Sequence, residues 1–354
     1  MDKPISTGII GFGIAGKVFH APFISANPCF HLSKISTSNE ESVLFIRKNY
    51  PQAEIVWDAK VILDDSAIEL VIIGTPNQSH FSVTKAALLS GKHVIVEKPF
   101  TVTTTEADEL IALAATQKKV LTVHHNRRWD SDYKTVKKII ENKLLGNLIE
   151  YEAHFDRFRP VLKEHEWREE DVPGSGILYD LGSHLIDQAV QLFGLPQEIT
   201  ADIRKERQGA KTDDYFDLGL FYPNLKVILK AGMLVENPGP HFILTGERGS
   251  FIKYGMDVQE VALKAGQTPA TNDNWGVEPE YLWGKFNKKA NGHNIEETIK
   301  SEQGSYQDFF INVYKTIKGE DELYVKATQA RDTIRIIELA IKSNYEKQKL
   351  SYSH

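Results

Sequence analysis

The stretch Gly11-Phe12-Gly13-Ile14-Ala15-Gly16 decides the fold of this 354-residue chain. It follows the apolar run Thr7–Ile10 and precedes a segment with helical spacing, as a dinucleotide-binding loop does. In such a loop the first glycine permits a tight turn, the second lets the backbone approach a pyrophosphate, and the third lets helix and strand pack closely. A second strand ends at Thr37, roughly 20 residues after the loop, as expected for this unit. We therefore predict that the chain begins with a nucleotide-binding βαβ unit.

Strands and helices alternate from this loop to about residue 123. Glycine or proline marks the end of several elements, and β-branched residues are frequent in the strands. The alternation predicts a parallel sheet whose strands are joined by right-handed crossovers. The predicted strands are His31–Thr37, Glu69–Ile73, His93–Val96 and Val120–Val123, and the predicted helices are Glu40–Tyr50, Phe81–Ser90 and Thr104–Gln117.

Beyond residue 123 the pattern changes, and we place a domain boundary there. Two successive hairpins predict an antiparallel sheet. Residues 265–300 have weak periodicity, and we interpret them as an irregular excursion. The prediction is an α/β dinucleotide-binding domain over residues 1–123 and an α+β domain over residues 124–354. The predicted elements of the second domain are helices Asp132–Asn142, Ile177–Phe193 and Thr328–Lys347, the extended stretch Leu148–Arg159, and the hairpins Phe216–Tyr222 with Lys226–Leu234 and Phe242–Thr245 with Ser250–Tyr254.

Composition excludes several classes of protein. There are 42 basic and 48 acidic residues, so a net charge of −6 argues against nucleic acid or an anionic membrane as the main partner. The single cysteine, Cys29, cannot form an internal disulfide or a thiolate cluster, which favours a reducing, cytoplasmic location. The 12 histidines show no metal-ligand spacing, and the adjacent pair His124-His125 would face opposite ways on a strand. We predict no metal and no membrane segment.

The end of the second strand indicates which nucleotide binds. NAD-binding units have a carboxylate there, which holds the ribose 2′-hydroxyl and would repel a 2′-phosphate. Here the stretch is Ser36-Thr37-Ser38, and no carboxylate appears before Glu40. NADP is therefore favoured. NAD, or the use of both, stays open because no arginine stands beside the serines.

Two further motifs carry reactive side chains. Glu97-Lys98-Pro99 follows the strand His93–Val96, and ligands of open parallel sheets bind beyond the carboxyl ends of strands, so Lys98 would point into the cofactor cleft. The alternative is an ordinary solvated lysine. On the predicted helix Ile177–Phe193, Asp180 and His184 share a face with Asp187 and Gln191. The alternative for that helix is a plain amphipathic helix with a solvated face.

Four motifs in this order and spacing resemble the glucose–fructose oxidoreductase / inositol dehydrogenase (Gfo/Idh/MocA) family over essentially the whole chain. Two more stretches, Asn126–Asp130 and Phe155–Pro160, look like the branch that contains NADP-dependent scyllo-inositol dehydrogenases. One departure is His125 before Asn126, where relatives often have glutamine. The four motifs are Gly11–Gly16, Gly74-Thr75-Pro76-Asn77 with His80, Glu97-Lys98-Pro99, and Gly176–His184.

The resemblance implies a Rossmann domain followed by a domain whose open, mostly antiparallel sheet forms a homodimer or homotetramer interface. It implies a catalytic triad of Lys98, Asp180 and His184, and a cis peptide bond before Pro99. With the residues discussed above, the predicted cofactor site comprises Gly11, Phe12, Gly13, Ile14, Ala15, Gly16, Ser36, Thr37, Ser38, Thr75, Pro76, Asn77, His80, Glu97 and Lys98.

Hydride transfer explains why such a triad is needed. When a carbinol C–H leaves as hydride, the hydroxyl must lose its proton, and a neutral imidazole suits that task. We expect His184 to be the base, Lys98 to stabilise the developing alkoxide, and Asp180 to orient substrate and histidine. The predicted substrate-binding residues, for each of which a structural role is the alternative, are Asn126, Arg127, Trp129, His154 and Arg157.

The function implied is hydride transfer between NADP or NAD and a hydroxyl group of a cyclic polyol or sugar. Two alternatives come from the same family. One is a cofactor-binding regulator without turnover, and the other is an NAD-dependent glycosidase with no net redox change.

Overall fold

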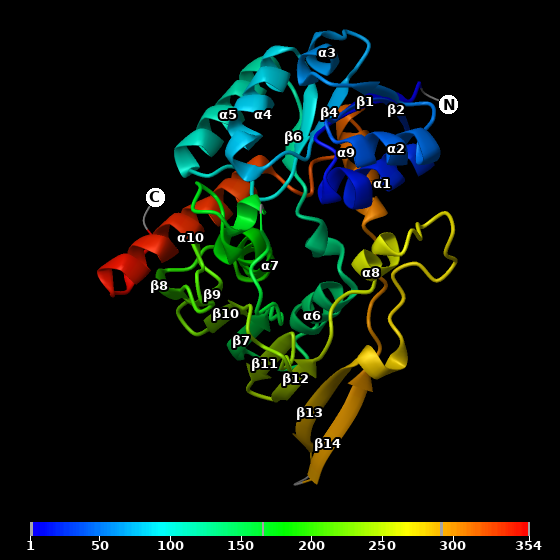
Figure 1. The fold of residues 1–354 in the computed structure, drawn as a ribbon. Coiled ribbons are helices and arrows are strands. Elements are labelled where there is room, and N and C mark those ends of the chain that lie inside the picture. Colours follow the sequence, from blue (N-terminus) through cyan, green and yellow to red (C-terminus); the bar gives the residue numbers. More distant parts are fainter. Residues whose placement is uncertain (1–2, 165, 291–292, 353–354) are drawn as a thin grey trace. The chain divides into compact units, whose positions relative to one another are not determined.

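The first sheet of the computed structural model is parallel and has six strands in the order β3-β2-β1-β4-β5-β6 (Figure 1). The structure describes residues 3–164, 166–290 and 293–352. This order is that of a doubly wound dinucleotide-binding sheet, so the predicted Rossmann architecture is confirmed. The short strand β3 is not among the predicted elements. The strands are β1 (Ile5–Ile10), β2 (Phe30–Ser36), β3 (Glu54–Val56), β4 (Leu70–Ile73), β5 (His93–Val96) and β6 (Leu121–Val123).

Local sequence explains how these elements begin and end. All four residues of β4 are fully buried, as expected for a strand covered on both faces. Thr103 and Glu106 form a reciprocal capping box at the start of α5, which ends at Lys118 in the left-handed conformation. The helices are α1 (Ala21–Ala26), which follows a π-helical segment at Ala15–His20, α2 (Glu40–Asn49), α3 (Ala59–Asp64), α4 (His80–Leu89) and α5 (Thr104–Gln117).

The second sheet has nine strands in the order β14-β13-β12-β11-β7-β10-β9-β8-β15. All neighbouring pairs for which a register is given are antiparallel except β7 with β10, so the predicted mostly antiparallel sheet is confirmed. Both predicted hairpins form, as β9–β10 and β11–β12. The strands are β7 (Leu148–His154), β8 (Glu198–Arg204), β9 (Tyr215–Phe221), β10 (Lys226–Gly232), β11 (Phe242–Gly246), β12 (Gly249–Lys253), β13 (Gly284–Ala290), β14 (His293–Ile299) and β15 (Leu350–Ser351).

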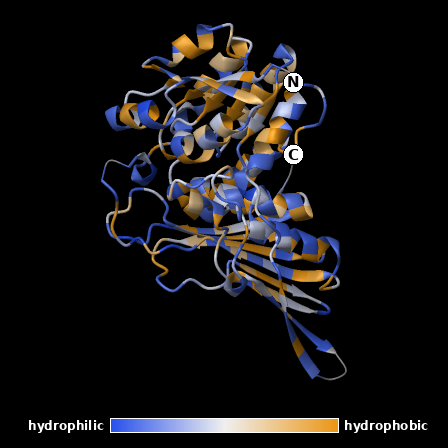
Figure 2. Cartoon of the chain, turned by 90° about the vertical axis from the view of Figure 1, so that its right-hand side faces the viewer, coloured by the Kyte–Doolittle hydropathy of each residue, from blue (hydrophilic) through white to orange (hydrophobic). Residues whose placement is uncertain are grey.

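The interpretation of residues 265–300 as irregular is wrong for the hairpin of β13 and β14, which extends the edge of this sheet. Most residues of β14 are exposed, and the hairpin is largely hydrophilic (Figure 2). Its strands are held by backbone pairing and by cross-strand ion pairs such as Lys288 with Glu297 at 2.8 Å. A hairpin that buries so little shows no apolar alternation, and alternation is the signal that predicts strands.

The helix predicted at Ile177–Phe193 consists of a π-helical turn, Leu178–Gly182, followed by α7 (Ser183–Phe193). It ends at Gly194, whose φ of +75° favours glycine. The alternative of a fully solvated polar face is wrong for His184 and Asp187, because both are buried. Asp187 accepts two hydrogen bonds from the guanidinium group of Arg128, at 2.8 and 2.6 Å. The buried ion pair, which joins residues far apart in the chain, replaces water on that face.

Contacts divide the chain into two compact units. The first contains residues up to Asn126 together with Gln259–Trp275 and Tyr306–Arg331, and the second contains the remainder. Aromatic packing explains the return of the two later segments, because Phe23 of α1 stacks on Phe310 at 5.3 Å and contacts Trp275 edge-on. The predicted boundary at residue 123 stays a prediction.

The remaining helices include the longest that the structure describes, α10, with 20 residues. In α10, Ala330, Ile334 and Ile337 are buried, whereas Tyr345 is exposed. None of the helices in the described ranges has the length and apolar character needed to cross a membrane. The cytoplasmic location stays a prediction. These helices are α6 (Ser131–Glu141), α8 (Gln259–Lys264), α9 (Gln307–Ile317) and α10 (Ala327–Glu346).

Candidate functional site

The glycine loop lies where the adjacent parallel strands β1 and β4 end, which is the point where strand order reverses. Gly11 has a φ of +87°, and a Cβ there would lie 2.8 Å from the carbonyl oxygen of Gly74. A Cβ on Gly16 would lie 2.7 Å from the carbonyl oxygen of Gly11. A Cβ on Gly13, by contrast, would meet nothing within 4 Å, and this residue is exposed. The first and third glycines are thus needed for packing, and the second leaves its backbone open to a ligand.

The end of β2 presents hydroxyl and amide groups. Ser36 and Thr37 are buried and Ser38 is exposed. Asn39 caps α2 by accepting a hydrogen bond from the Ser42 N–H at 2.8 Å. The Thr37 hydroxyl oxygen accepts the Asn39 N–H at 3.2 Å. Ser38 is therefore the best placed of the three predicted residues to donate to a ribose hydroxyl or phosphate.

The loop Gly74–Asn77 is tied to the Lys98-Pro99 turn by His80, which is fully buried. The His80 ring places Nδ1 2.8 Å from the carbonyl oxygen of Pro99 and Nε2 3.0 Å from that of Thr75. Burial lowers the pKa of His80. Both ring nitrogens contact protein, so His80 supports the two loops, and its direct contact with a cofactor stays a prediction.

Glu97 lies at the centre of a buried hydrogen-bond network. Its Oε1 accepts hydrogen bonds from His20 Nε2 at 2.7 Å and His124 Nδ1 at 2.8 Å, while its Oε2 accepts the Lys98 N–H at 3.1 Å. Burial alone would raise the pKa of Glu97, but the two imidazoles bring it well below its ordinary value. Burial lowers the pKa of His20 to about 4. Both oxygens of the Glu97 carboxylate therefore accept hydrogen bonds from the protein, and one of them holds the backbone N–H of Lys98.

The same three side chains have ligand atoms within 4.8 Å of one another, which is close enough for a metal ion. In the structure these atoms are hydrogen-bonded to each other, at 2.7 and 2.8 Å. The prediction that no metal binds stays a prediction. The cis peptide bond predicted between Lys98 and Pro99 is confirmed, and Lys98 is half-buried.

In the second unit, Asp180 and His184 lie on the helix that begins after Gly176. Asp180 is half-buried, and its Oδ1 lies 3.7 Å from the Arg168 Nε. His184 is 6% exposed and stacks on Phe155 with ring centroids 6.5 Å apart. The helix thus presents a carboxylate and an imidazole beside a cationic and an aromatic neighbour.

Phe155 brings several predicted substrate residues together. The guanidinium carbons of Arg127 and Arg157 lie 4.8 and 4.9 Å from its ring centroid. Arg127 also donates to Asp130 at 3.0 Å. Two of the predicted substrate residues therefore contact the ring on which His184 stacks.

The other predicted substrate residues are placed as follows. Trp129 is buried in the second unit, and Asn126 is buried in the first. His154 lies between Glu152 and Asp156, at 3.2 and 3.5 Å, and although burial opposes it, these carboxylates raise its pKa. Contact of these side chains with substrate stays a prediction.

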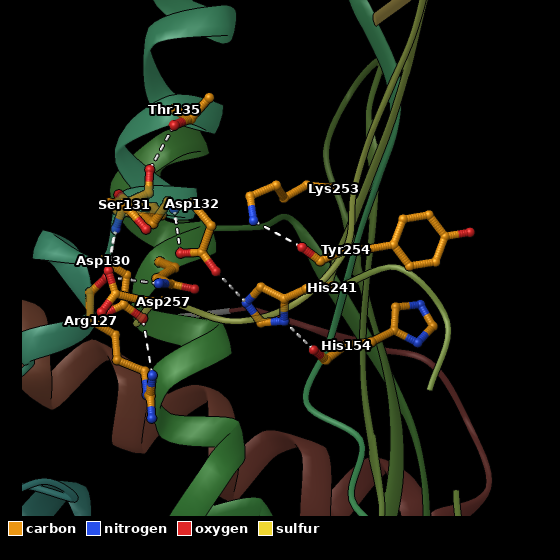
Figure 3. Close-up of polar contacts among 12 residues, drawn as sticks. Arg127, Asp130, Ser131, Asp132, Thr135, His154, His241, Lys253, Tyr254 and Asp257 are labelled. Atoms are coloured by element: carbon orange, nitrogen blue, oxygen red, sulfur yellow. Dashed lines mark hydrogen bonds and ion pairs between the residues drawn. The ribbon is translucent and has the colours of Figure 1, made fainter. Parts of the chain in front are cut away.

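A buried polar cluster fixes the strand end that carries His154. Figure 3 shows the His241 ring between the carboxylate of Asp132 and the backbone of His154. His241 Nδ1 donates to the His154 carbonyl oxygen, and Nε2 lies 3.6 Å from Asp132 Oδ2. Burial lowers the pKa of His241 to about 3 and raises that of Asp132 to about 6. The cluster joins α6 to the end of β7.

Sequence reasoning assigned no role to Phe155, Arg168 or Asp213, although each contacts this part of the second unit. The available signals are weak. Phe155 begins the run Phe155–Pro160 in which aromatic residues and arginines alternate, and Asp213 belongs to a carboxylate pair immediately before a strand.

Comparison with known proteins agrees with this geometry. Residues 5–125 match the family model described as "Oxidoreductase family, NAD-binding Rossmann fold", and residues 137–352 match "Oxidoreductase family, C-terminal alpha/beta domain". The chain is 40% identical over 350 residues to scyllo-inositol 2-dehydrogenase (NADP(+)) IolW of Bacillus subtilis, covering 99% of this chain and 96% of that protein. It is 43% identical over 343 residues to the oxidoreductase YdgJ of Escherichia coli, described as uncharacterized, covering 97% of each.

Solved structures show the same similarity. The structure of YvaA from Bacillus subtilis matches with a TM-score of 0.94 at 40% identity, covering 99% of this chain and 98% of that one. The YPO2259 structure from Yersinia pestis matches with a TM-score of 0.93 at 37% identity, covering 100% and 99%. Because both parts of the chain match and the relatives are similar over nearly their full length, this chain belongs to the Gfo/Idh/MocA family of oxidoreductases and has that family's NAD-binding Rossmann domain.

Proposed function

We propose that this protein is an NADP-dependent dehydrogenase that acts on a CH–OH group of an inositol-like cyclic polyol or a sugar. The observation that carries this proposal is the similarity, over nearly the full length of both chains, to a protein named scyllo-inositol 2-dehydrogenase (NADP(+)). The open backbone at Gly13 supports it, because a pyrophosphate must approach the loop at this residue.

The residues present fit a nicotinamide dinucleotide. The backbone of Gly11–Gly16 would hold its pyrophosphate, and the loop Thr75–Asn77 would line the same edge of the sheet. Ser38 is exposed, and no carboxylate stands between it and Glu40 in the sequence. It would face the 2′-position of the ribose and accommodate a 2′-phosphate. When bound, the cofactor supplies the hydride acceptor.

The chain's own residues would handle the proton and the developing charge. In our proposal, an imidazole nitrogen of His184 accepts the hydroxyl proton, and the Lys98 ammonium stabilises the alkoxide. Asp180 orients the substrate and the imidazole. The hydrogen bond from the Lys98 N–H to Glu97 Oε2 supports this role for Lys98, because it restricts the lysine's backbone.

We assign the substrate-binding surface to Arg127, Arg157, His154, Trp129 and Asn126. The support for the two arginines is their common contact with Phe155, the ring on which His184 stacks. Guanidinium groups offer several N–H donors in a fixed plane, which suits the hydroxyl groups of a polyol.

We also propose that the protein forms a dimer or tetramer through strands of residues 148–260. Apolar side chains on these strands support this, since Ile149 is 55% exposed and Ile228, Ile243 and Ile252 are half-buried. Light scattering at micromolar concentration tests it. A single species of 40.0 kDa would contradict it.

The test of the function is a panel of scyllo-inositol, myo-inositol, simple sugars and glycosides with NADP or NAD. Reduction of the cofactor is followed at about 340 nm, the band of reduced nicotinamide. We expect turnover with a polyol or sugar and NADP, and loss of turnover in His184→Ala. Tight nucleotide binding without turnover would instead indicate a regulator. Glycoside cleavage without net cofactor reduction would indicate a glycosidase.

A further inference from the structure

A carboxylate outside the predicted site holds the start of the helix that carries Asp180 and His184. Asp213 Oδ2 accepts a hydrogen bond from the Leu178 N–H at 2.8 Å, and the Asp213 carbonyl oxygen accepts the Ile177 N–H at 3.1 Å. The first N–H groups of a helix have no partner within the helix itself. Asp213 therefore caps this helix from a segment 35 residues further along the chain.

Gly176 makes this contact possible. Its φ of +86° favours glycine, and a Cβ there would overlap Asp213 Oδ1 and lie 2.8 Å from Thr212 Oγ1. On its other side, the Gly176 N–H donates to the Arg168 carbonyl oxygen at 3.3 Å. The entry to the helix is therefore held between two segments, and any side chain at residue 176 would displace the carboxylate.

Asp214, the residue after Asp213, is connected to the segment that contains Arg168. Asp214 Oδ2 accepts a hydrogen bond from Arg207 Nε at 2.9 Å, and Arg207 Nη2 donates to Glu169 Oε2 at 2.7 Å. Arg207 is 6% exposed. Glu169 follows Arg168, whose Nε lies 3.7 Å from Asp180 Oδ1. The two adjacent aspartates thus connect to opposite sides of the same helix entry.

We propose that Asp213 is a positioning residue for the proposed dehydrogenase, because its carboxylate holds the turn that presents Asp180 and His184. This inference rests on the proposed function. A carboxylate is also favourable at a helix N-terminus, where the helix dipole is positive. Desolvation raises the pKa of Asp213 to about 6, and the N–H donors of Leu178 and Ile177 oppose that rise. The carboxylate is thus kept close to the helix despite a cost in solvation.

The kinetic test compares Asp213→Ala with Asp213→Asn. Alanine removes the acceptor for the Leu178 N–H, and a displacement of about 1 Å in catalytic groups lowers turnover roughly 100-fold. We expect kcat of Asp213→Ala to fall by roughly 10- to 100-fold, with a smaller change in KM for NADP. Asparagine caps helices about as well as aspartate, so Asp213→Asn should retain kcat within about threefold of the wild type.

A matched control comes from another helix of the same chain. Asp58 is the N-cap residue of α3, and its Oδ1 likewise accepts a helix N–H, that of Lys60 at 2.8 Å. Asp58→Ala therefore removes an equivalent cap away from Asp180 and His184 in the sequence. We expect it to lower thermal stability as Asp213→Ala does and to leave kcat unchanged.

Hydrogen–deuterium exchange of residues 177–184 tests the cap without relying on activity. We expect faster exchange there in Asp213→Ala, and wild-type exchange in Asp213→Asn and Asp58→Ala. If Asp213→Ala does not fold, Gly176→Ala displaces the carboxylate and is subject to the same expectations.

The outcomes separate this inference from the proposed function. Wild-type protein that turns over no polyol or sugar would overturn the proposed function, while exchange would still show whether Asp213 holds the turn. Unchanged exchange or unchanged kcat in Asp213→Ala would overturn the positioning role. Equal loss of kcat in Asp213→Asn and Asp213→Ala would also overturn it, because a restored hydrogen bond should restore turnover.

Discussion

Substitution of Gly13 by alanine should separate cofactor binding from stability. A Cβ at this residue meets nothing within 4 Å in the protein, and its φ lies outside the left-handed region. Alanine should therefore stabilise the folded state by about 0.4–1 kcal/mol, through the reduced entropy of the unfolded chain. The same methyl group would occupy the space into which a pyrophosphate must come. Loss of one hydrogen bond to a charged group costs about 1.5–3 kcal/mol, which weakens binding roughly 10- to 100-fold.

Two measurements check this prediction: NADPH titration followed by nucleotide fluorescence, and urea unfolding without nucleotide. Gly11→Ala is the matched control, because its φ is +87° and its Cβ would lie 2.8 Å from the Gly74 carbonyl oxygen. That change should destabilise the protein by about 1–3 kcal/mol from backbone strain alone. NADPH affinity of Gly13→Ala equal to that of the wild type would refute the reasoning, since the cofactor would then not approach this loop.

Four further changes have defined expectations. NADP should bind more tightly than NAD, and Ser38→Asp should reverse this in titrations with both nucleotides, because a carboxylate repels the 2′-phosphate; tighter wild-type binding of NAD would contradict it. His184→Ala should lower kcat roughly 10²- to 10⁴-fold with NADPH affinity retained, and near-normal turnover would exclude His184 as the base. Lys253 and Glu278 form a buried ion pair at 3.1 Å, so Lys253→Met should cost about 3–5 kcal/mol in urea unfolding, with recovery when Glu278→Met is added. Burial lowers the pKa of His20 from 6.5 to about 4. As the pH falls below 6.5, His20 therefore gains its proton in the unfolded chain before it does so in the folded protein. The free energy of unfolding should then fall by about 1.4 kcal/mol per pH unit, down to about pH 4. His20→Gln should remove this component, and an unchanged slope between pH 6.5 and 4 would count against it.

The sequence alone determined the nucleotide-binding half of the fold. The glycine loop and the strands of the first sheet agree with the structure to within about two residues, apart from β3. These features depend on local physics: buried parallel strands are continuous apolar runs, and a φ of +87° at Gly11 favours glycine. Neighbouring residues carry that information, so it can be read without a structure.

Other features depended on contacts between distant residues. The β13–β14 hairpin was not predicted because its apolar alternation is weak. Its strands are held by backbone pairing and by surface ion pairs. The return of residues 306–331 to the first unit depends on aromatic packing, such as Phe310 against Phe23. Neither feature leaves a periodic pattern in its own segment.

In the candidate site, too, the sequence indicated some residues and only the structure showed others. Motifs pointed to Lys98, Asp180 and His184, whereas the groups that hold them in place appear only in three dimensions. Asp213 caps the helix from 35 residues away, and Glu97 meets His20 across 77 residues. A carboxylate in a sequence looks the same whether it is solvated or enclosed. Its role depends on which N–H groups the folded chain brings to it, and on the solvent that those contacts exclude.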